Sequence, residues 1–177
     1  MNGESVSEAV GNLHGHGVET RRNSVQYLAN QNPAEVLPIL RQLPLTDDME
    51  YQLSVAEAML IVDCSTTLAE VLFLLRSSEA WVRQYMCGLL HDYGNALALD
   101  ELVRLAQYDP DSDVRAMACY ALGGIGDAKS IEPLRVVAFD DQSVDYQGEP
   151  VRNHAVAALA TLAARFAGIT ESEAGCR

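Results

Sequence analysis

The sequence predicts an all-α protein built from stacked helix pairs. Alanine and leucine supply most of the apolar residues and aromatic residues make up only 6%, a composition that favours helices. A valine–arginine pair recurs at Val82-Arg83, Val114-Arg115 and Val151-Arg152, and a leucine follows each arginine by seven residues. Because one small helix pair cannot bury its own apolar face, such repeats stack on their neighbours around a continuous core.

Three columns of residues set the repeat register. The leucine column advances in steps of 32, 30, 32 and 37 residues, through Leu28, Leu60 (or its neighbour Met59), Leu90, Leu122 and Leu159. Turn residues follow the first four leucines by four positions, at Asn32, Cys64, Gly94 and Gly126. A second leucine column follows by twelve, at Leu40, Leu72, Leu102 and Leu134. The recurrence predicts about four and a half repeats of two helices each.

Each predicted helix has local support. First helices are expected at about 21–30, 51–62, 80–92, 113–123 and 150–166, and second helices at about 33–43, 66–76, 97–107 and 130–139. Pro33 suits a first helical turn with Asn32 as its cap, and Asp127 and Ser130 are further cap candidates. We therefore expect a partly helical or mobile segment over 1–17, a repeat domain over 18–166 and a polar tail over 167–177.

The best-formed copy carries a family resemblance. Residues 109–134, DPDSDVRAMACYALGGIGDAKSIEPL, resemble the HEAT-like repeat of the phycocyanobilin lyase type. Copies 82–106 and 151–166 match less closely, and copies 21–43 and 51–76 diverge. The resemblance implies a short right-handed α–α superhelix, a HEAT-like solenoid. It implies a binding surface more than an activity.

Charge and composition exclude some classes of binding partner and indicate a cellular location. Twelve Lys and Arg against 25 Asp and Glu give a net charge of −13, which argues against nucleic acid and anionic membranes. No uninterrupted apolar run approaches the roughly 18 residues of a membrane span, and the N-terminus does not resemble a signal peptide. Four widely spaced cysteines without a CxxC motif suit a reducing cytoplasm, where we expect the protein.

An arginine column accompanies the repeat, at Arg21, Arg83, Arg115 and Arg152. It could form an anion-binding ladder. Its regular recurrence favours a structural role instead, in which each guanidinium bonds carboxylates or carbonyls of the inter-repeat loops.

The inter-repeat loops gather acidic residues along one edge. They hold 11 of the 25 acids, among them the candidate partner-binding residues Asp109, Asp111, Asp113, Asp140, Asp141 and Asp145. Tyr51, Trp81, Tyr108 and Tyr146 lie in or beside the same loops, and Tyr and Trp are enriched at interface hot spots. Such an edge would attract a basic protein. Alternatively, the acids cap helices and the aromatics fill gaps between repeats. The long segment 139–149 could be a binding loop, as insertions in repeat arrays often are, or a tolerated surface extension.

A second candidate surface lies on the second helices. These should line the concave face, where solenoid proteins bind extended partners. The residues expected there are Glu35, Arg41, Glu70, Arg76, Glu101, Arg104, Glu132 and Arg135.

Catalytic and metal signals are weak. His14 and His16 lack a third fixed ligand, and the single His91-Asp92 pair does not reproduce the His-Glu pairs of the HEAT-repeat enzyme deoxyhypusine hydroxylase. Cys87 and Cys119 occupy a column that holds valine in other copies, so we expect them in the core. We expect no cofactor, no metal and no catalytic residue.

The resulting functional hypothesis is a non-catalytic protein-binding scaffold or adaptor with an acidic surface and a basic partner. Three alternatives remain open: an immunity-type inhibitor of a toxin, a bilin lyase or chaperone-like subunit, and an enzyme with a site in the groove. A neighbouring toxin gene, bilin binding, or a buried charged cluster would distinguish them.

Overall fold

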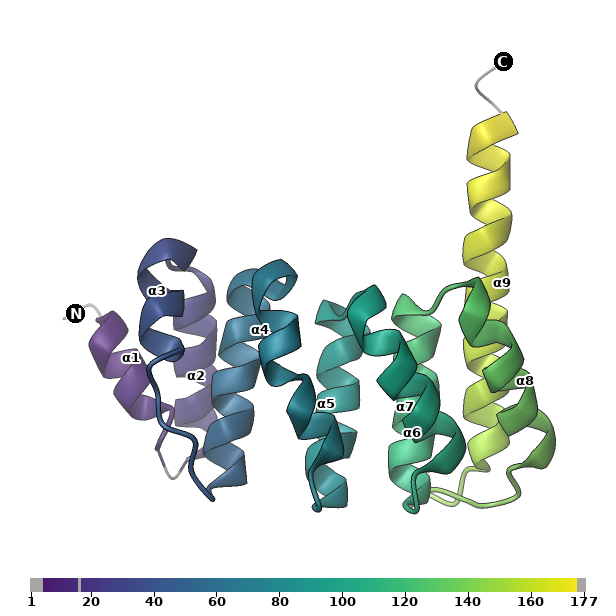
Figure 1. The fold of residues 1–177 in the computed structure, drawn as a ribbon, viewed down its shortest axis with the longest axis horizontal. Helices are drawn as coiled ribbons and strands as arrows, with labels where there is room; N and C mark the ends of the chain where they lie inside the picture. Colours follow the sequence, from purple (N-terminus) through teal and green to yellow (C-terminus); the bar gives the residue numbers. More distant parts are fainter. Residues whose placement is uncertain (1–4, 16, 175–177) are drawn as a thin grey trace. The chain divides into compact units, whose positions relative to one another are not determined.

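The computed structural model describes residues 5–15 and 17–174, and within these residues it is helical, with a single isolated strand bridge (Figure 1). The all-α prediction is therefore confirmed for this part of the chain. The helices group into two compact units, and the chain passes from the first to the second between Val71 and Leu72. Each unit has its own set of helix contacts.

The first unit contains α1 (Val6–Asn12), α2 (Val18–Ala29), α3 (Pro33–Leu40) and α4 (Met49–Val71). Helix α2 packs against α1 and α4, and α3 packs against α4. The predicted cap of α3 is confirmed: the Asn32 side chain accepts the N–H of Ala34, and Pro33 begins the helix. Helix α1 lies inside the segment 1–17 and buries Ala9 and Val10.

Helix α4 consists of two helices joined at a kink. Asp63 has non-helical angles, φ −162° and ψ 87°, and its carboxylate accepts hydrogen bonds from the residues that start the second half. These bonds, from Ser65 and Thr66, lower the Asp63 pKa. The break falls between the two helices that the sequence predicts over 51–62 and 66–76.

The same stretch is apolar enough to be compared with a membrane span. By length and composition alone, Met49–Arg76 is the one helical stretch among the described residues that could cross a membrane, although the sequence offered no uninterrupted apolar run. Its 18-residue window is 44% buried within the protein, and a core helix passes the same test. The stretch is therefore weak evidence for a membrane location.

The second unit forms two layers of helices. One layer is α5 (Ala80–Tyr93), α7 (Ser112–Ile125) and α9 (Val151–Ala174), with α7 in contact with both others. In front of it in Figure 1 lie α6 (Leu99–Tyr108), on α7, and α8 (Ile131–Asp140), on α9. Three short 3-10 helices precede α5, α6 and α8: η1 (Leu72–Arg76), η2 (Ala96–Ala98) and η3 (Ala128–Ser130).

The repeat columns form the core. Leu28, Leu60, Leu90 and Leu122 are fully buried, whereas Leu159 on α9 is partly exposed. Gly126 is the C-cap of α7. A glycine is needed there because a Cβ would lie 2.3 Å from the Leu122 carbonyl oxygen. After it, the predicted cap Asp127 forms a capping box at η3.

The last helix is longer than expected. The sequence predicts a helix to residue 166 and then a polar tail, but α9 continues to Ala174. The added residues 167–174, AGITESEA, hold alanine or glutamate, both strong helix formers, at four of their eight positions.

Candidate functional site

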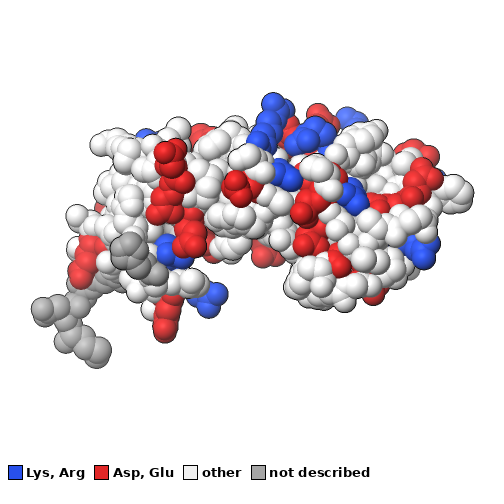
Figure 2. Space-filling view, turned by 90° about the horizontal axis from the view of Figure 1, so that it is seen from below, with Lys and Arg blue, Asp and Glu red and all other residues white. Residues whose placement is uncertain are grey.

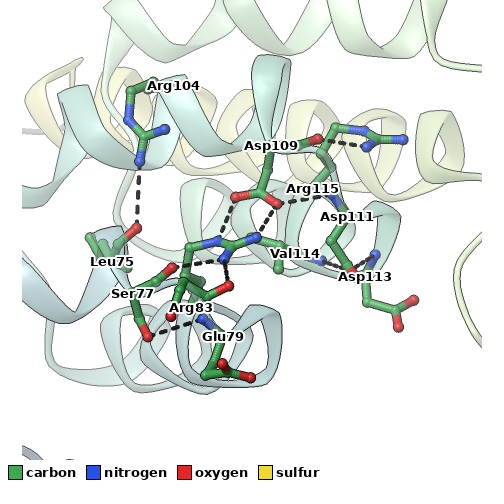
Figure 3. A network of polar contacts seen from close by, with 11 residues as sticks. Leu75, Ser77, Glu79, Arg83, Arg104, Asp109, Asp111, Asp113, Val114 and Arg115 are labelled. Carbon is green, nitrogen blue, oxygen red and sulfur yellow. Dashed lines mark hydrogen bonds and ion pairs between the residues drawn. The ribbon is translucent and has the colours of Figure 1, made fainter.

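The arginine column holds successive helix pairs together. Arg83 donates from Nε and Nη2 to the two carboxylate oxygens of Asp109, at 2.8 and 2.7 Å (Figure 3). Its Nη1 donates to the carbonyl oxygens of Ser77 and Ser78, at 2.8 and 3.2 Å. The side chains of Arg83 and Asp109 are 9% and 2% exposed. One guanidinium therefore joins the loop before α5 to the loop after α6.

Arg115 repeats this geometry one helix pair later. Its Nε donates to Asp141 at 2.7 Å, and its Nη1 donates to the Asp109 carbonyl oxygen at 2.7 Å. In both cases the carbonyl lies six residues before the arginine and the carboxylate 26 residues after it. Arg21, in the first unit, also bonds a carbonyl six residues earlier, that of Gly15, and pairs with Glu50.

Arg152 departs from the pattern. It is exposed and donates to the Gln142 side chain at 2.9 Å. The guanidinium groups of the other three arginines bond oxygens of the same unit, in the loops for Arg83 and Arg115 and also on α4, at Glu50, for Arg21, which gives them a structural role.

Three acids expected to meet a partner are instead used inside the fold. Asp109 is buried against Arg83, and Asp141 pairs with Arg115 and accepts from Ser143. Burial alone would raise the Asp141 pKa, but the Arg115 and Ser143 hydrogen bonds leave it lowered. Asp145 accepts backbone N–H groups of its own loop, and the N–H of Glu149 first among them lowers its pKa. Assigning Asp109 and Asp141 to partner binding was therefore wrong, whereas Asp145, although bonded within its own loop, lines a groove on this unit.

The other loop acids divide between capping and exposure. Asp111 is the N-cap of α7 and accepts the N–H groups of Asp113 and Val114. Asp113 instead accepts the N–H of Tyr146 at 2.7 Å, and Asp140 is exposed. On the face shown in Figure 2, Asp and Glu lie in separate groups, several of them beside Arg or Lys.

The four aromatic candidates differ in exposure: one is buried and three are on the surface. Tyr51 is 1% exposed and stacks on His14 with ring centroids 3.6 Å apart, so placing it on a partner surface was wrong. Burial raises its pKa, and its hydroxyl has no hydrogen-bond partner among the described residues. Trp81, Tyr108 and Tyr146 remain exposed, at 44%, 73% and 72%.

The second-helix candidates pair with one another. Glu101 accepts hydrogen bonds from both Arg76 and Arg104, and Glu132 pairs with Arg135 at 3.5 Å. Burial opposes ionisation of Glu101, yet the two arginines leave its pKa lowered. In the first unit Arg41 and Glu70 form an equivalent pair. This face therefore presents balanced ion pairs rather than unpaired charge.

A groove forms where the long 139–149 segment folds back. An isolated bridge between Val144 and Pro150 closes the loop, and its Tyr146 amide is bonded to Asp113 on α7. The groove has a volume of about 250 Å³. Its lining includes Gln84, Asp113, Met117, Tyr120, Tyr146 and His154. Sequence reasoning missed Tyr120, Met117 and His154, although Met117 and His154 share one repeat position, two residues after the column arginine.

Two cysteines of the second unit lie in its core, as the sequence predicts. Cys87 and Cys119 are buried, and burial raises the pKa of Cys119 to about 12 and that of Cys87 further. His91 stacks on Tyr120, and His16 lies outside the described residues. In the described part of the chain, no group of three or more His, Cys, Asp or Glu residues is placed to hold a metal ion.

A family comparison agrees with this geometry. The profile described as HEAT repeats matches residues 67–160, which is more than half of the chain. The chain belongs to the HEAT repeat family. No match was found among curated proteins. The matched HEAT repeats contain both buried arginine–aspartate pairs and the groove between α7, α9 and the long loop.

HEAT repeats are commonly protein-interaction scaffolds. In this member, Trp81, Tyr85, Tyr120 and the groove lie on the layer of first helices. The second helices also expose Tyr108 and Phe139, but charged residues on those helices form ion pairs with one another. The first-helix layer is thus the better candidate for a partner surface.

Proposed function

We propose that this HEAT-repeat protein is a non-catalytic scaffold or adaptor that binds a basic protein partner through the first-helix layer of its second unit. The observation that carries the proposal is the set of large aromatic side chains left exposed on that layer. Trp81 and Tyr85 on α5 and Tyr120 on α7 are each about half exposed, and Tyr146 stands beside them on the long loop. Exposed aromatics of this kind are typical interface anchors.

Charge supports a basic partner. The net charge of −13 attracts cationic proteins and speeds their encounter at low salt. The acids bonded to arginine, such as Asp109 and Asp141, contribute little local field because their charge is balanced. The steering therefore comes from exposed acids such as Glu79 and from Asp113 in the groove.

The finer architecture belongs to the same proposal. We take the repeats to continue through both units as a right-handed α–α superhelix of about four and a half helix pairs. Support comes from the buried leucine columns. It also comes from Arg21, Arg83 and Arg115, each of which donates to the carbonyl oxygen six residues before it.

Two narrower functions fit within these features. An immunity-type inhibitor of a basic toxin would use the same acidic, aromatic surface. A bilin lyase or chaperone-like subunit rests on the resemblance of residues 109–134 to the phycocyanobilin lyase type, and titration with a free bilin tests it.

The test of the proposal is capture by the immobilised full chain. Proteins retained from a lysate at low salt are identified, and the same experiment is run with Trp81→Ala and with Phe139→Ala. Phe139 is an exposed aromatic on α8, outside the proposed surface, and serves as a matched control. We expect a basic protein to be retained by the wild type and by Phe139→Ala and lost with Trp81→Ala. Retention of the same protein by all three would contradict the proposed surface.

A further inference from the structure

The groove of the second unit combines two carboxylates, Asp113 and Asp145, with aromatic walls and a single histidine, His154. Its lining comes from α5, α7, α9 and the long loop, and it contains no Lys or Arg. Ala116 and Met117 supply an apolar floor on α7, and Tyr120 and Tyr146 are exposed at its sides. Such a combination suits a flat organic cation that can both stack and form an ion pair.

Asp113 is the less engaged of the two carboxylates in this groove. Asp109 and Asp141, outside the groove, each pair with an arginine, and Asp145 hydrogen-bonds to His154 at 2.9 Å and accepts two backbone N–H groups of its own loop. Among the described residues Asp113 forms no ion pair, and its hydrogen bond from the Tyr146 amide engages only Oδ1. In Figure 3 its carboxylate points away from the Arg83–Asp109 network. A half-buried carboxylate attracts a cation more strongly than one in open water.

The aromatic walls are held in place before any ligand arrives. Tyr120 stacks on His91 with ring centroids 3.8 Å apart and an interplanar angle of 10°, so one face of the Tyr120 ring is already covered. The loop that carries Tyr146 is closed by the Asp145 N–H to Glu149 bond at 2.9 Å and the Val151 N–H to Ser143 bond at 3.0 Å. A preorganised groove loses less conformational entropy on binding.

We propose that this groove binds an arginine side chain of the basic partner, with the guanidinium paired to Asp113 and stacked on the tyrosines. The inference rests on the proposed function and names its specificity. Arginine fits better than lysine because a planar guanidinium can stack on an aromatic face while it donates to a carboxylate, whereas an ammonium is a compact, strongly hydrated charge.

The surface continues from the groove to the exposed tryptophan. Trp81 on α5 and Asp113 on α7 occupy the same repeat position, two residues before the column arginine, and α5 and α7 are neighbours. A basic segment could therefore place its arginine in the groove while an adjacent residue contacts Trp81.

The experiment uses hexa-arginine, hexa-lysine and uncharged hexa-citrulline as probes of the full chain at physiological salt. Binding constants are measured by titration, and backbone amide shifts locate the site by NMR. We expect hexa-arginine to bind several-fold more tightly than hexa-lysine, hexa-citrulline to bind weakly, and the amides of Tyr146 and His154 to shift. Equal affinity for the arginine and lysine peptides would overturn the proposed specificity.

Two variants and a control localise the effect. Asp113→Asn keeps an oxygen for the Tyr146 amide but removes the charge, and Asp140→Asn removes one charge from an exposed acid outside the groove. We expect about a tenfold loss of hexa-arginine affinity for Asp113→Asn and less than about a twofold loss for Asp140→Asn. Tyr120→Leu should also weaken binding, which keeps the test decisive if Asp113→Asn disturbs the loop.

The outcomes separate this inference from the proposed function. If Asp113→Asn and Tyr120→Leu bind hexa-arginine as Asp140→Asn does, the groove assignment is wrong, while a basic protein captured through Trp81 would leave the scaffold function standing. If no basic protein is captured at all, the proposed function fails together with the natural role of the groove.

Discussion

Replacing Arg83 by alanine should strip a buried carboxylate of its counter-ion. The guanidinium donates two hydrogen bonds to Asp109 and two to the carbonyl oxygens of Ser77 and Ser78. Among the described residues, the Asp109 carboxylate would then keep only the hydrogen bond from the Asp111 N–H. Breaking a buried ion pair by removing one partner costs about 3–5 kcal/mol, so we expect the free energy of unfolding to fall by about that amount.

Denaturant unfolding followed by circular dichroism measures the change. Arg152→Ala is the matched control, because this arginine belongs to the same column but is exposed, and its removal should cost less than about 0.5 kcal/mol. Removing both partners in Arg83→Met with Asp109→Leu should restore much of the loss, since no unpaired charge remains. Equal stability of Arg83→Ala and Arg152→Ala would refute the structural role, above all if Arg83→Ala then lost a bound partner.

Three further changes test other parts of the structure. Tyr51→Phe should leave thermal stability unchanged or slightly raised, because the buried hydroxyl has no partner, whereas Tyr51→Ala should cost about 3–5 kcal/mol. Cys119 should resist iodoacetamide at pH 8 in the folded protein, as its pKa is raised to about 12 by burial, and fast labelling without unfolding would contradict this. The folded-state pKa of Asp141 is lowered from 3.8, so its pairing with Arg115 stabilises the fold above about pH 4 and is lost as the pH falls through the lowered pKa. The difference in unfolding free energy between wild type and Asp141→Asn should therefore shrink on acidification. A constant difference would be evidence against the pair.

The helix pairs could be predicted because their signals are periodic. The leucine columns and the turn residues Asn32 and Asp127 mark helix interiors and starts, and these signals act over one or two turns of chain. The role of Arg83 followed from its recurrence. Its partner Asp109 was available in the sequence as well, since the same 26-residue offset joins Arg115 to Asp141.

The surface was harder to predict because it depends on contacts between distant residues. Tyr51 occupies the repeat position of Trp81 when Leu60 is aligned with Leu90, yet only Tyr51 is covered, by His14 from the segment after α1. The groove likewise exists only because the long loop folds onto α7 through the bond between Asp113 and the Tyr146 amide, 33 residues apart. No local pattern reports either contact.

Site-specific photo-crosslinking tests the proposed partner surface most directly. A photoreactive phenylalanine analogue replaces Trp81 in one full-length variant and Phe139 in another, and adducts formed in a lysate are identified by mass spectrometry. Trp81 lies on the proposed first-helix layer, and Phe139 is an exposed aromatic on α8. We predict adducts with one basic protein from position 81, weakened by added salt, and none with that protein from position 139. Adducts formed only from position 139, or from position 81 with acidic proteins, would contradict the proposed function.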